Sequence, residues 1–200
     1  DYLFVTEKSG LENLKKEGIP DSKVFFVGHV MIDSLVHYLP KIEKRETINV
    51  RRGAMGGVSN HQSSVDNQTK SKAQRGKRLA ESGSPTPYSL SAKPYILVTM
   101  HRPSNVDDKT KLGELLKMLN RLAEKRKVVF PIHPRTRNNI EKFGLSIEIS
   151  ENLIITEPIG YLDFIGLVKN AEVILTDSGG IQEESTCLGV QCVTLRTSTE

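Results

Sequence analysis

The segment that indicates the fold most clearly is residues 173–184, which reads VILTDSGGIQEE. Its first residues are apolar or β-branched and predict a short buried strand, and those after the glycine pair predict a helix. A glycine turn between a strand and a helix leaves backbone N–H groups free at the positive end of the helix, where phosphates bind readily. The glycines let such an anion approach the backbone. An ordinary strand-to-helix turn with Ser178 as the N-cap is the alternative, and this segment alone does not decide.

Strand and helix patterns alternate along the rest of the C-terminal half of the chain. Near-continuous apolar runs predict strands at residues 95–99, 128–130, 153–155, 173–176 and 192–195. Amphipathic or clearly bounded segments predict helices at residues 112–122, 135–143, 161–170 and 181–188. Apolar strands separated by helices indicate an α/β fold with a doubly wound, Rossmann-like parallel sheet that is covered on both faces.

The first 43 residues predict further elements that lead into this α/β domain. Strands are expected at residues 2–5 and 24–27. Ser9 is expected to cap a helix that ends at Gly18, because serine ahead of a periodic apolar run is a frequent N-cap. A second helix carries Ile32 and Leu35 on one face. It is expected to end at Pro40, because proline interrupts helical hydrogen bonding.

Residues 44–93 show neither helical nor strand periodicity. They hold ten lysines and arginines against three acidic residues, a net charge of +7 in a chain whose total is +4. Such a composition predicts a flexible, basic, low-complexity insertion. A basic arm for nucleic acid is the alternative, but Tyr88 is the single aromatic residue of the segment, so nucleic acid is not an expected partner. The predicted organisation is lead-in elements (1–43), the insertion (44–93) and the main domain (94–200).

Cysteine content and hydropathy limit where the protein is expected to work. The two cysteines, Cys187 and Cys192, lie five residues apart and fit no disulfide framework, which favours a reducing compartment such as the cytoplasm. No apolar run approaches the ~20 residues that span a bilayer, so no membrane association is expected. Histidine, cysteine and acidic residues show no metal-ligand spacing, so no metal is expected either.

Polar side chains follow the predicted strands at the points where the strands end. His101 and Arg102 follow the first strand of the main sheet, His133 follows the second, and Ser178 follows the fourth. Carboxyl ends of parallel strands meet at one edge of a sheet, where such sheets bind ligands. This arrangement predicts an anionic ligand that carries phosphates, most simply a nucleotide. Alternatives for single residues stay open: a loop cap for His101, a packed histidine for His133 and a core position for Phe164.

Six motifs carry a resemblance to a known family. They are VTMHRPSNVD (98–107), PIHPR (131–135), LTDSGGIQEE (175–184), Thr199-Glu200, GIPDS (18–22) and IDSL (32–35). Together they resemble the non-hydrolysing UDP-N-acetylglucosamine 2-epimerases, over about residues 1–43 and 94–200. The resemblance implies two Rossmann-like domains arranged as in the glycosyltransferase-B fold, with the active site between them. It implies that this chain is the UDP-binding portion, cut short at its C-terminus, with the N-terminal domain missing.

The resemblance also implies a reaction and a set of site residues. The reaction interconverts UDP-GlcNAc and UDP-ManNAc by anti elimination of UDP and its re-addition, with C2 taking a proton on its other face and with no cofactor. His101 is the expected catalytic residue, which supports the departing diphosphate. The expected substrate-binding residues are Ser178, Gly179 and Gly180 for the diphosphate, Glu184 for the ribose, Phe164 for the uracil, and Arg102 and His133 as second contributors.

The expected partners are UDP-N-acetylglucosamine, UDP and, in the full-length protein, a second copy of the chain in a homodimer. The residues that move protons at C2 belong to the family's first domain, so the isolated chain is expected to bind UDP weakly and not to epimerise. Two enzymatic alternatives remain, a hydrolysing UDP-GlcNAc 2-epimerase and a glycosyltransferase-B type UDP-sugar transferase. A basic binding module built on the insertion is the non-enzymatic alternative.

Overall fold

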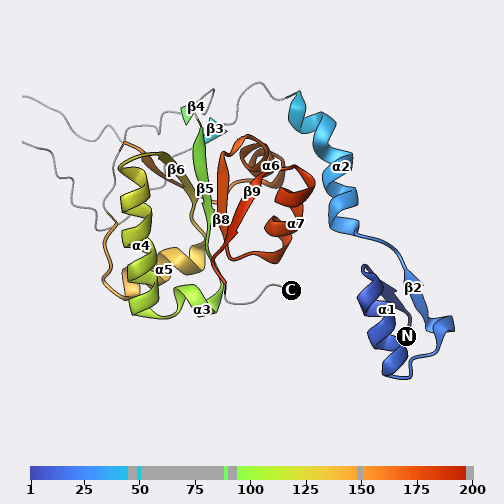
Figure 1. Cartoon of the computed structure of the whole chain (residues 1–200). Helices are drawn as coiled ribbons and strands as arrows, with labels where there is room; N and C mark the ends of the chain where they lie inside the picture. Colours follow the sequence, from blue (N-terminus) through green and yellow to red (C-terminus); the bar gives the residue numbers. More distant parts are fainter. Residues whose placement is uncertain (45–48, 51–87, 90–93, 148–150, 197–200) are drawn as a thin grey trace, which may run out of the picture.

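The computed structural model describes residues 1–44, 49–50, 88–89, 94–147 and 151–196 (Figure 1). The insertion predicted at 44–93 lies almost wholly outside the described residues. Within it, β3 (Asn49–Val50) and β4 (Tyr88–Ser89) form a short antiparallel pair. The proposed flexibility of that segment therefore stays a prediction.

A five-stranded parallel sheet forms the centre of the main domain. Its strands are β5 (Tyr95–Thr99), β6 (Lys127–Pro131), β7 (Leu153–Thr156), β8 (Val173–Thr176) and β9 (Gln191–Thr194). Their order in the sheet is β7-β6-β5-β8-β9, and every neighbouring pair is parallel. The predicted fold class is confirmed: the chain forms a doubly wound, Rossmann-like sheet of the type that makes up one half of a glycosyltransferase-B fold.

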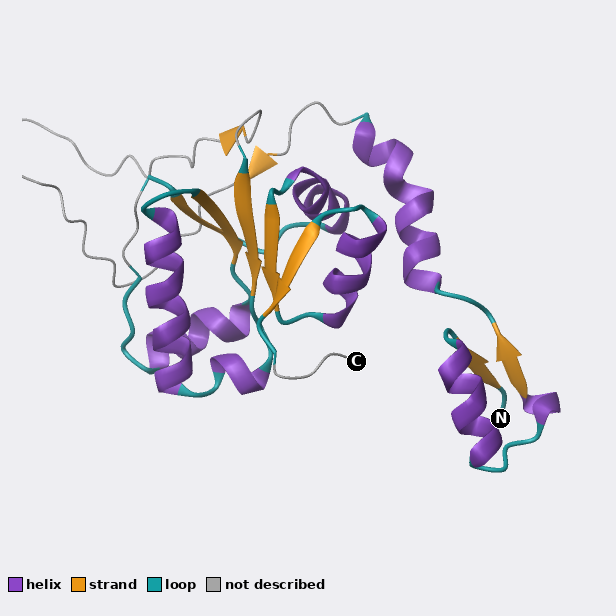
Figure 2. Cartoon of the chain, viewed as in Figure 1, coloured by secondary structure: helices purple, strands orange, loops and turns teal. Residues whose placement is uncertain are grey.

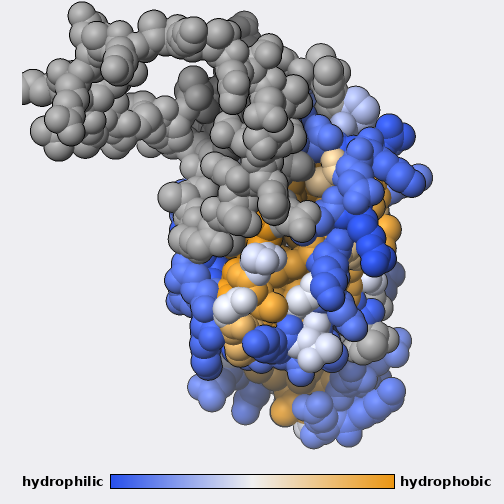
Figure 3. Space-filling view, turned by 90° about the vertical axis from the view of Figure 1, so that its left-hand side faces the viewer, coloured by the Kyte–Doolittle hydropathy of each residue, from blue (hydrophilic) through white to orange (hydrophobic). Residues whose placement is uncertain are grey.

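Helices cover both faces of this sheet (Figures 1 and 2). One face carries α3 (Pro103–Val106), α4 (Lys109–Ala123) and α5 (Pro134–Lys142). The other face carries α2 (Val30–Glu43), α6 (Tyr161–Asn170) and α7 (Gly179–Cys187). In Figure 3, which views the molecule from the side of α4, hydrophilic residues lie around an apolar area.

Side chains alternate along the strands between two hydrophobic cores. Val98, Val128 and Phe130 point into the core under α4 and α5, whereas Leu97 and Val129 point into the core under α2 and α6. This alternation is the period-two geometry of a strand, and it explains why each strand reads as a continuous apolar run. The predicted leucine stripe of α4 faces the first core through its fully buried members, Leu112, Leu116 and Leu119.

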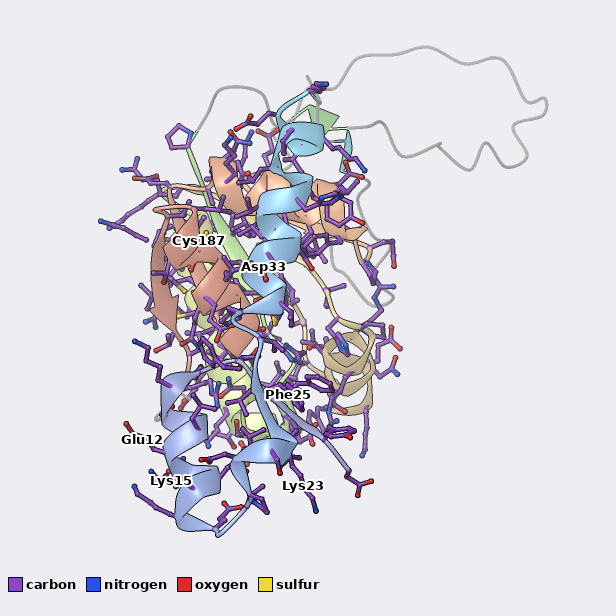
Figure 4. All side chains as sticks on the ribbon, turned by 90° about the vertical axis from the view of Figure 1, so that its right-hand side faces the viewer. Glu12, Lys15, Lys23, Phe25, Asp33 and Cys187 are labelled. Carbon is purple, nitrogen blue, oxygen red and sulfur yellow. The ribbon has the colours of Figure 1, made fainter. Side chains whose placement is uncertain are left out.

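The N-terminal elements form a separate unit. β1 (Leu3–Val5) and β2 (Val24–Phe26) pair in a two-stranded parallel sheet that does not join the main sheet. Helix α1 (Lys8–Lys16) and the short 3₁₀ helix η1 (Asp21–Lys23) connect them. Phe4 and Phe26 on these strands are 69% and 53% exposed. Figure 4 shows Phe25 in this unit and, further along the chain, α2 lying across α7.

Helix α2 links this unit to the main domain. It packs against α6 and α7 and buries Leu35 and Ile42 in the second core. The prediction that Pro40 ends this helix is wrong, because Pro40 lies inside it. The last turn beyond the proline is held by the burial of Ile42 and by the ion pair between Lys169 Nζ and Glu43 Oε1 at 2.5 Å.

Two further local predictions differ from the structure. Glu7, not Ser9, occupies the N-cap of α1, and the Ser9 hydroxyl instead donates a hydrogen bond to Glu7 Oε2 at 3.3 Å. Helix α3 was not predicted, since the segment after β5 contains no apolar period. Its start is fixed by Pro103 at the first helical position, where the fixed φ of proline suits a helix.

Candidate functional site

The strand order places one crevice in this fold between β5 and β8. The chain leaves β5 toward β6 on one side and leaves β8 toward β9 on the other, so the loops after these two neighbouring strands diverge. Ligands bind at such a switch point in doubly wound sheets. The two loops carry residues 100–105 and 177–180, which include His101, Ser178 and the glycine pair.

Asp177 ties these two loops together. Its carboxylate is fully buried and accepts hydrogen bonds from the backbone N–H groups of His101 (3.1 Å) and Arg102 (2.9 Å). It also accepts from Asn105 Nδ2 at 3.1 Å, and His101 Nδ1 lies 3.1 Å from Oδ1. Burial alone would raise the pKa of Asp177, but the hydrogen bonds from His101, Arg102 and Asn105 outweigh it and hold the pKa below its ordinary value. The negative charge of the buried Asp177 carboxylate is therefore stabilised by its hydrogen-bond donors.

Asn105 extends this network to the last strand. The same Nδ2 group also donates to the backbone carbonyl of Leu195, just after β9, at 2.8 Å. The sequence analysis gave neither Asn105 nor Asp177 a role. Both residues lie in the quoted motifs. Local periodicity, however, cannot show that a carboxylate is buried among hydrogen-bond donors that follow another strand.

The N-terminus of α7 has the form that a phosphate site requires. Ser178 occupies the N-cap position, but its side chain makes no capping hydrogen bond, and its backbone N–H donates to Thr176 Oγ1 at 3.0 Å. Gly179 and Gly180 form the first turn, whose N–H groups have no acceptor within the helix. A Cβ on Gly180 would lie 2.6 Å from Met31 Cε, so the missing side chain lets α2 approach closely.

A pocket of about 300 Å³ opens beside this glycine pair. His29 and Glu183 line it and form an ion-pair contact, with His29 Nε2 3.0 Å from Glu183 Oε2. The hydrogen bond to Glu183 raises the pKa of His29. His29 was not among the site residues predicted from the sequence. In the structure its Nδ1 also accepts the Ile32 N–H at 3.4 Å, at the N-cap of α2.

His133 lies close to His101 at the same edge of the sheet. Their ring centroids are 5.5 Å apart. His133 is the N-cap of α5, and its Nδ1 accepts the backbone N–H of Arg135 at 3.1 Å. Desolvation, and then the nearby charges of His101 and Arg135, lower the pKa of His133. The structure thus brings His101, His133 and Asp177 together.

Arg102 lines a pocket whose lining includes neither His101 nor the glycine pair. This pocket of about 870 Å³ is also lined by Leu115, Met118 and Arg196, between α3, α4 and the end of β9. The backbone N–H of Arg102 still belongs to the Asp177 network. The contribution of the Arg102 side chain to the diphosphate site stays a prediction.

Glu184 and Phe164 lie on the side of the sheet that α2 covers. Glu184, one turn into α7, is only 3% exposed, and the Tyr161 hydroxyl donates to its Oε1 at 2.9 Å. Desolvation raises the pKa of Glu184, and burial beside that carboxylate raises the pKa of Tyr161 to about 12. Phe164 is half-buried and packs against the second core. Tyr161 was not among the site residues predicted from the sequence, and the fold is what reveals its hydrogen bond to Glu184.

The residues that the structure describes contain no cluster of three or more histidine, cysteine or acidic side chains placed to hold a metal ion. No helix among them is both long and apolar enough to cross a bilayer. Both cysteines are free thiols.

Comparison with known proteins identifies the family. Residues 62–200 match the family model described as UDP-N-acetylglucosamine 2-epimerase. The chain belongs to the UDP-N-acetylglucosamine 2-epimerase family. The resemblance found in the sequence motifs is confirmed, and the match begins inside the segment predicted to be an insertion.

The names of two similar proteins are consistent with this family. The UDP-N-acetylglucosamine 2-epimerase of Methanococcus maripaludis is 36% identical over 204 residues, which is 100% of this chain and 46% of that protein. The UDP-2,3-diacetamido-2,3-dideoxy-D-glucuronate 2-epimerase of Pseudomonas aeruginosa is 32% identical over 203 residues, 100% of this chain and 45% of that protein. The chain thus spans about half the length of the curated relatives that it matches.

A solved structure shows the same architecture. The UDP-GlcNAc 2-epimerase of Methanocaldococcus jannaschii, in complex with UDP-GlcNAc and UDP, is similar with a TM-score of 0.69 and 30% sequence identity. The similarity covers 99% of this chain and 46% of that chain.

Proposed function

We propose that the full-length protein is an isomerase that interconverts UDP-GlcNAc and UDP-ManNAc, and that this chain supplies its UDP-binding half. The observation that carries the proposal is the buried Asp177 network, which joins the His101 loop to the Gly179–Gly180 turn at the switch point of the sheet. Family membership supplies the reaction class: anti elimination across C1–C2, in which C1 loses UDP and C2 loses a proton, followed by return of UDP to C1 and of a proton to the other face of C2.

The proposed roles follow from the charge that develops in this reaction. UDP leaves as an anion, so donors already fixed around the diphosphate stabilise the transition state. The N–H groups of Gly179 and Gly180, the Ser178 hydroxyl and the positive end of α7 are such donors. His101 lies at the neighbouring loop as the proposed catalytic residue for the leaving diphosphate, with His133 beside it.

The nucleoside part of UDP has two proposed contacts. Glu184 would accept hydrogen bonds from the ribose hydroxyls through Oε2, because Tyr161 occupies its Oε1. Phe164, on α6, would lie against the uracil. Arg102 belongs to the proposal as a second phosphate contributor, next to His101 in the segment after β5.

The identity of the sugar has one specific rival. The Pseudomonas aeruginosa relative is named for a diacetamido-glucuronate sugar, which shares the UDP group but not the substituents of GlcNAc. We favour UDP-GlcNAc because the Methanococcus maripaludis relative named for it has the higher identity, 36% against 32%.

Other features of the proposal concern the whole protein. Residues 94–200 would form the UDP-binding domain, with 44–93 as a basic insertion and 1–43 as the lead-in. The full-length protein would act as a cytoplasmic homodimer. The two free thiols, Cys187 and Cys192, support a reducing compartment.

Product analysis on the full-length protein tests the reaction. With UDP-GlcNAc as substrate, proton NMR should show UDP-ManNAc accumulating to equilibrium. Free ManNAc with stoichiometric UDP would instead identify a hydrolysing epimerase, and transfer of GlcNAc to an acceptor would identify a transferase. Turnover of the diacetamido-glucuronate sugar alone would move the assignment to the rival substrate.

A calorimetric titration of this chain with UDP tests the site. Ser178→Ala and Glu184→Ala should each weaken binding by about tenfold or more, because each removes a hydrogen bond that involves a charged group. Glu12→Ala, an exposed change on α1, is the matched control and should leave affinity unchanged. Equal affinity in all four proteins would contradict the proposed placement of UDP.

A further inference from the structure

His101 differs from the two other histidines whose ring hydrogen bonds the structure defines. In His29 and His133, Nδ1 accepts a backbone N–H group, from Ile32 and Arg135 respectively. An accepting nitrogen carries no proton, so the neutral forms of both rings have their proton on Nε2. In His101, by contrast, Nδ1 lies 3.1 Å from a carboxylate oxygen of Asp177.

A carboxylate can only accept, so this contact requires a proton on Nδ1 of His101. Asp177 is fully buried and already accepts from the backbone of His101 and Arg102 and from the side chain of Asn105. These donors fix the orientation of the carboxylate, so the oxygen that meets the imidazole cannot turn away. The His101 side chain is 38% exposed, and its other nitrogen, Nε2, is the one left for a ligand.

We propose that Asp177 is a positioning residue that holds His101 in the Nδ1–H tautomer and presents Nε2 to the diphosphate. The statement that Nε2 faces a diphosphate rests on the proposed function, whereas the statement that His101 is the Nδ1–H tautomer does not. When the solvent-accessible Nε2 of His101 takes a second proton from water, Nε2–H becomes a donor to the departing phosphate oxygen. Asp177 then supplies the opposite charge on the far side of the ring, and no bond of the substrate is broken or made by Asp177 itself.

The placement of this pair at the switch point gives it a second effect. Asp177 belongs to the turn that begins α7, and His101 belongs to the loop after β5. One carboxylate thus sets the distance between the histidine and the phosphate-binding N–H groups of Gly179 and Gly180. Positioning of this kind contributes to catalysis because small displacements of a charge-stabilising group weaken it strongly.

The tautomer can be measured directly on the ligand-free chain. Long-range ¹H–¹⁵N correlation spectra of the ¹⁵N-labelled protein, recorded at a pH where the rings are neutral, distinguish protonated from unprotonated ring nitrogens. We expect His101 as Nδ1–H and His133 as Nε2–H, so that one spectrum holds the test and its internal control. His101 in the Nε2–H form would overturn the proposal.

Two variants separate positioning from general structural loss. Asp177→Asn should return His101 to the Nε2–H form, because an amide NH₂ can donate to Nδ1. It should also weaken UDP binding by about tenfold, because an amide does not supply the negative charge that stabilises the doubly protonated ring beside the diphosphate. Glu172→Gln makes the same chemical change at an exposed carboxylate at the opposite end of β8 and should change neither. An Asp177→Asn protein that keeps both the Nδ1–H tautomer and the wild-type affinity would refute the assignment.

The remaining outcomes are also decisive. If Asp177→Asn fails to fold, the wild-type spectrum alone decides, because it requires no variant. If the wild-type chain shows the Nδ1–H tautomer but no UDP binding, the proposed function of this chain fails while the Asp177–His101 pairing stands.

Discussion

The hydrogen bond between Tyr161 and Glu184 allows a quantitative test of the structure. Glu184 is almost completely buried, and the Tyr161 hydroxyl is 2.9 Å from its Oε1. Tyr161→Phe removes this donor and keeps the ring. A hydrogen bond to a charged group contributes about 1.5–3 kcal/mol. We expect the lower end, about 1.5 kcal/mol of unfolding free energy, because Tyr161 is 41% exposed and water can replace part of the lost bond.

A double-mutant cycle isolates the charged part of this interaction. In a Glu184→Gln background the bond is between neutral groups, so Tyr161→Phe should cost only about 0.5–1 kcal/mol. The expected coupling between the two positions is thus about 0.5–1 kcal/mol, measured by urea unfolding of the four proteins at pH 7. Tyr38→Phe, on a ring 6.3 Å from Tyr161, is the matched control. Equal costs of Tyr161→Phe in both backgrounds would refute the reasoning.

The same carboxyl predicts a pH dependence with a definite sign. Desolvation raises the pKa of folded Glu184 above its unfolded value. The folded state therefore binds more protons between the two values, and stability falls as the pH rises through that window. A glutamine at position 184 does not titrate. The free energy of unfolding of Glu184→Gln, relative to that of the wild-type protein, should therefore increase from pH 4 to pH 7. Its affinity for UDP should be lower than that of the wild type. Urea unfolding at both pH values checks this, and a stability difference that does not change with pH would contradict it.

Further predictions concern packing and backbone geometry, each measured by urea unfolding. Leu119→Ala, in the core under α4, should lose about 3 kcal/mol, whereas Lys117→Ala on the exposed face of the same helix should change stability by less than about 0.5 kcal/mol. Gly113→Ala should gain about 0.5–1 kcal/mol, because its Cβ would lie at an ordinary 3.6 Å from Leu145 Cδ2 inside a helix. Gly189→Ala should lose about 1 kcal/mol, because Gly189 has φ of +70°. A stabilising Gly189→Ala would contradict the left-handed turn after α7.

The main sheet could be predicted from the sequence because each of its strands is marked by a pattern of neighbouring residues. Strands β5 to β8 are short runs of mostly apolar residues that are largely buried, and each crossover helix has its own apolar stripe or clear boundary. The position of the site at the carboxyl ends of the strands then follows from topology. Pro40 shows the limit of local rules, since the burial of Ile42 keeps the helix intact beyond the proline.

The partners within the site were not predictable for a related reason. The donors to Asp177 lie 72 to 76 residues before it in the sequence, so no spacing rule relates them. Arg102 is the N-cap of α3, a single turn that begins at Pro103 and has no apolar period to reveal it. Tyr161 resembled a core residue because the phenol ring is large and apolar, and only the fold shows that its hydroxyl meets Glu184.

The separate β1–β2 sheet has a consequence for how the chain opens. Two parallel strands cannot bury both faces, and the exposed rings of Phe4 and Phe26 show how little apolar surface they withdraw from water. Backbone amides in β1 and β2 should therefore exchange with deuterium by local opening of this small unit, at a rate set by the low stability of the unit itself. Amides in β5 and β6, between two cores, should exchange only when the whole domain unfolds, so the chain contains two regions of very different protection.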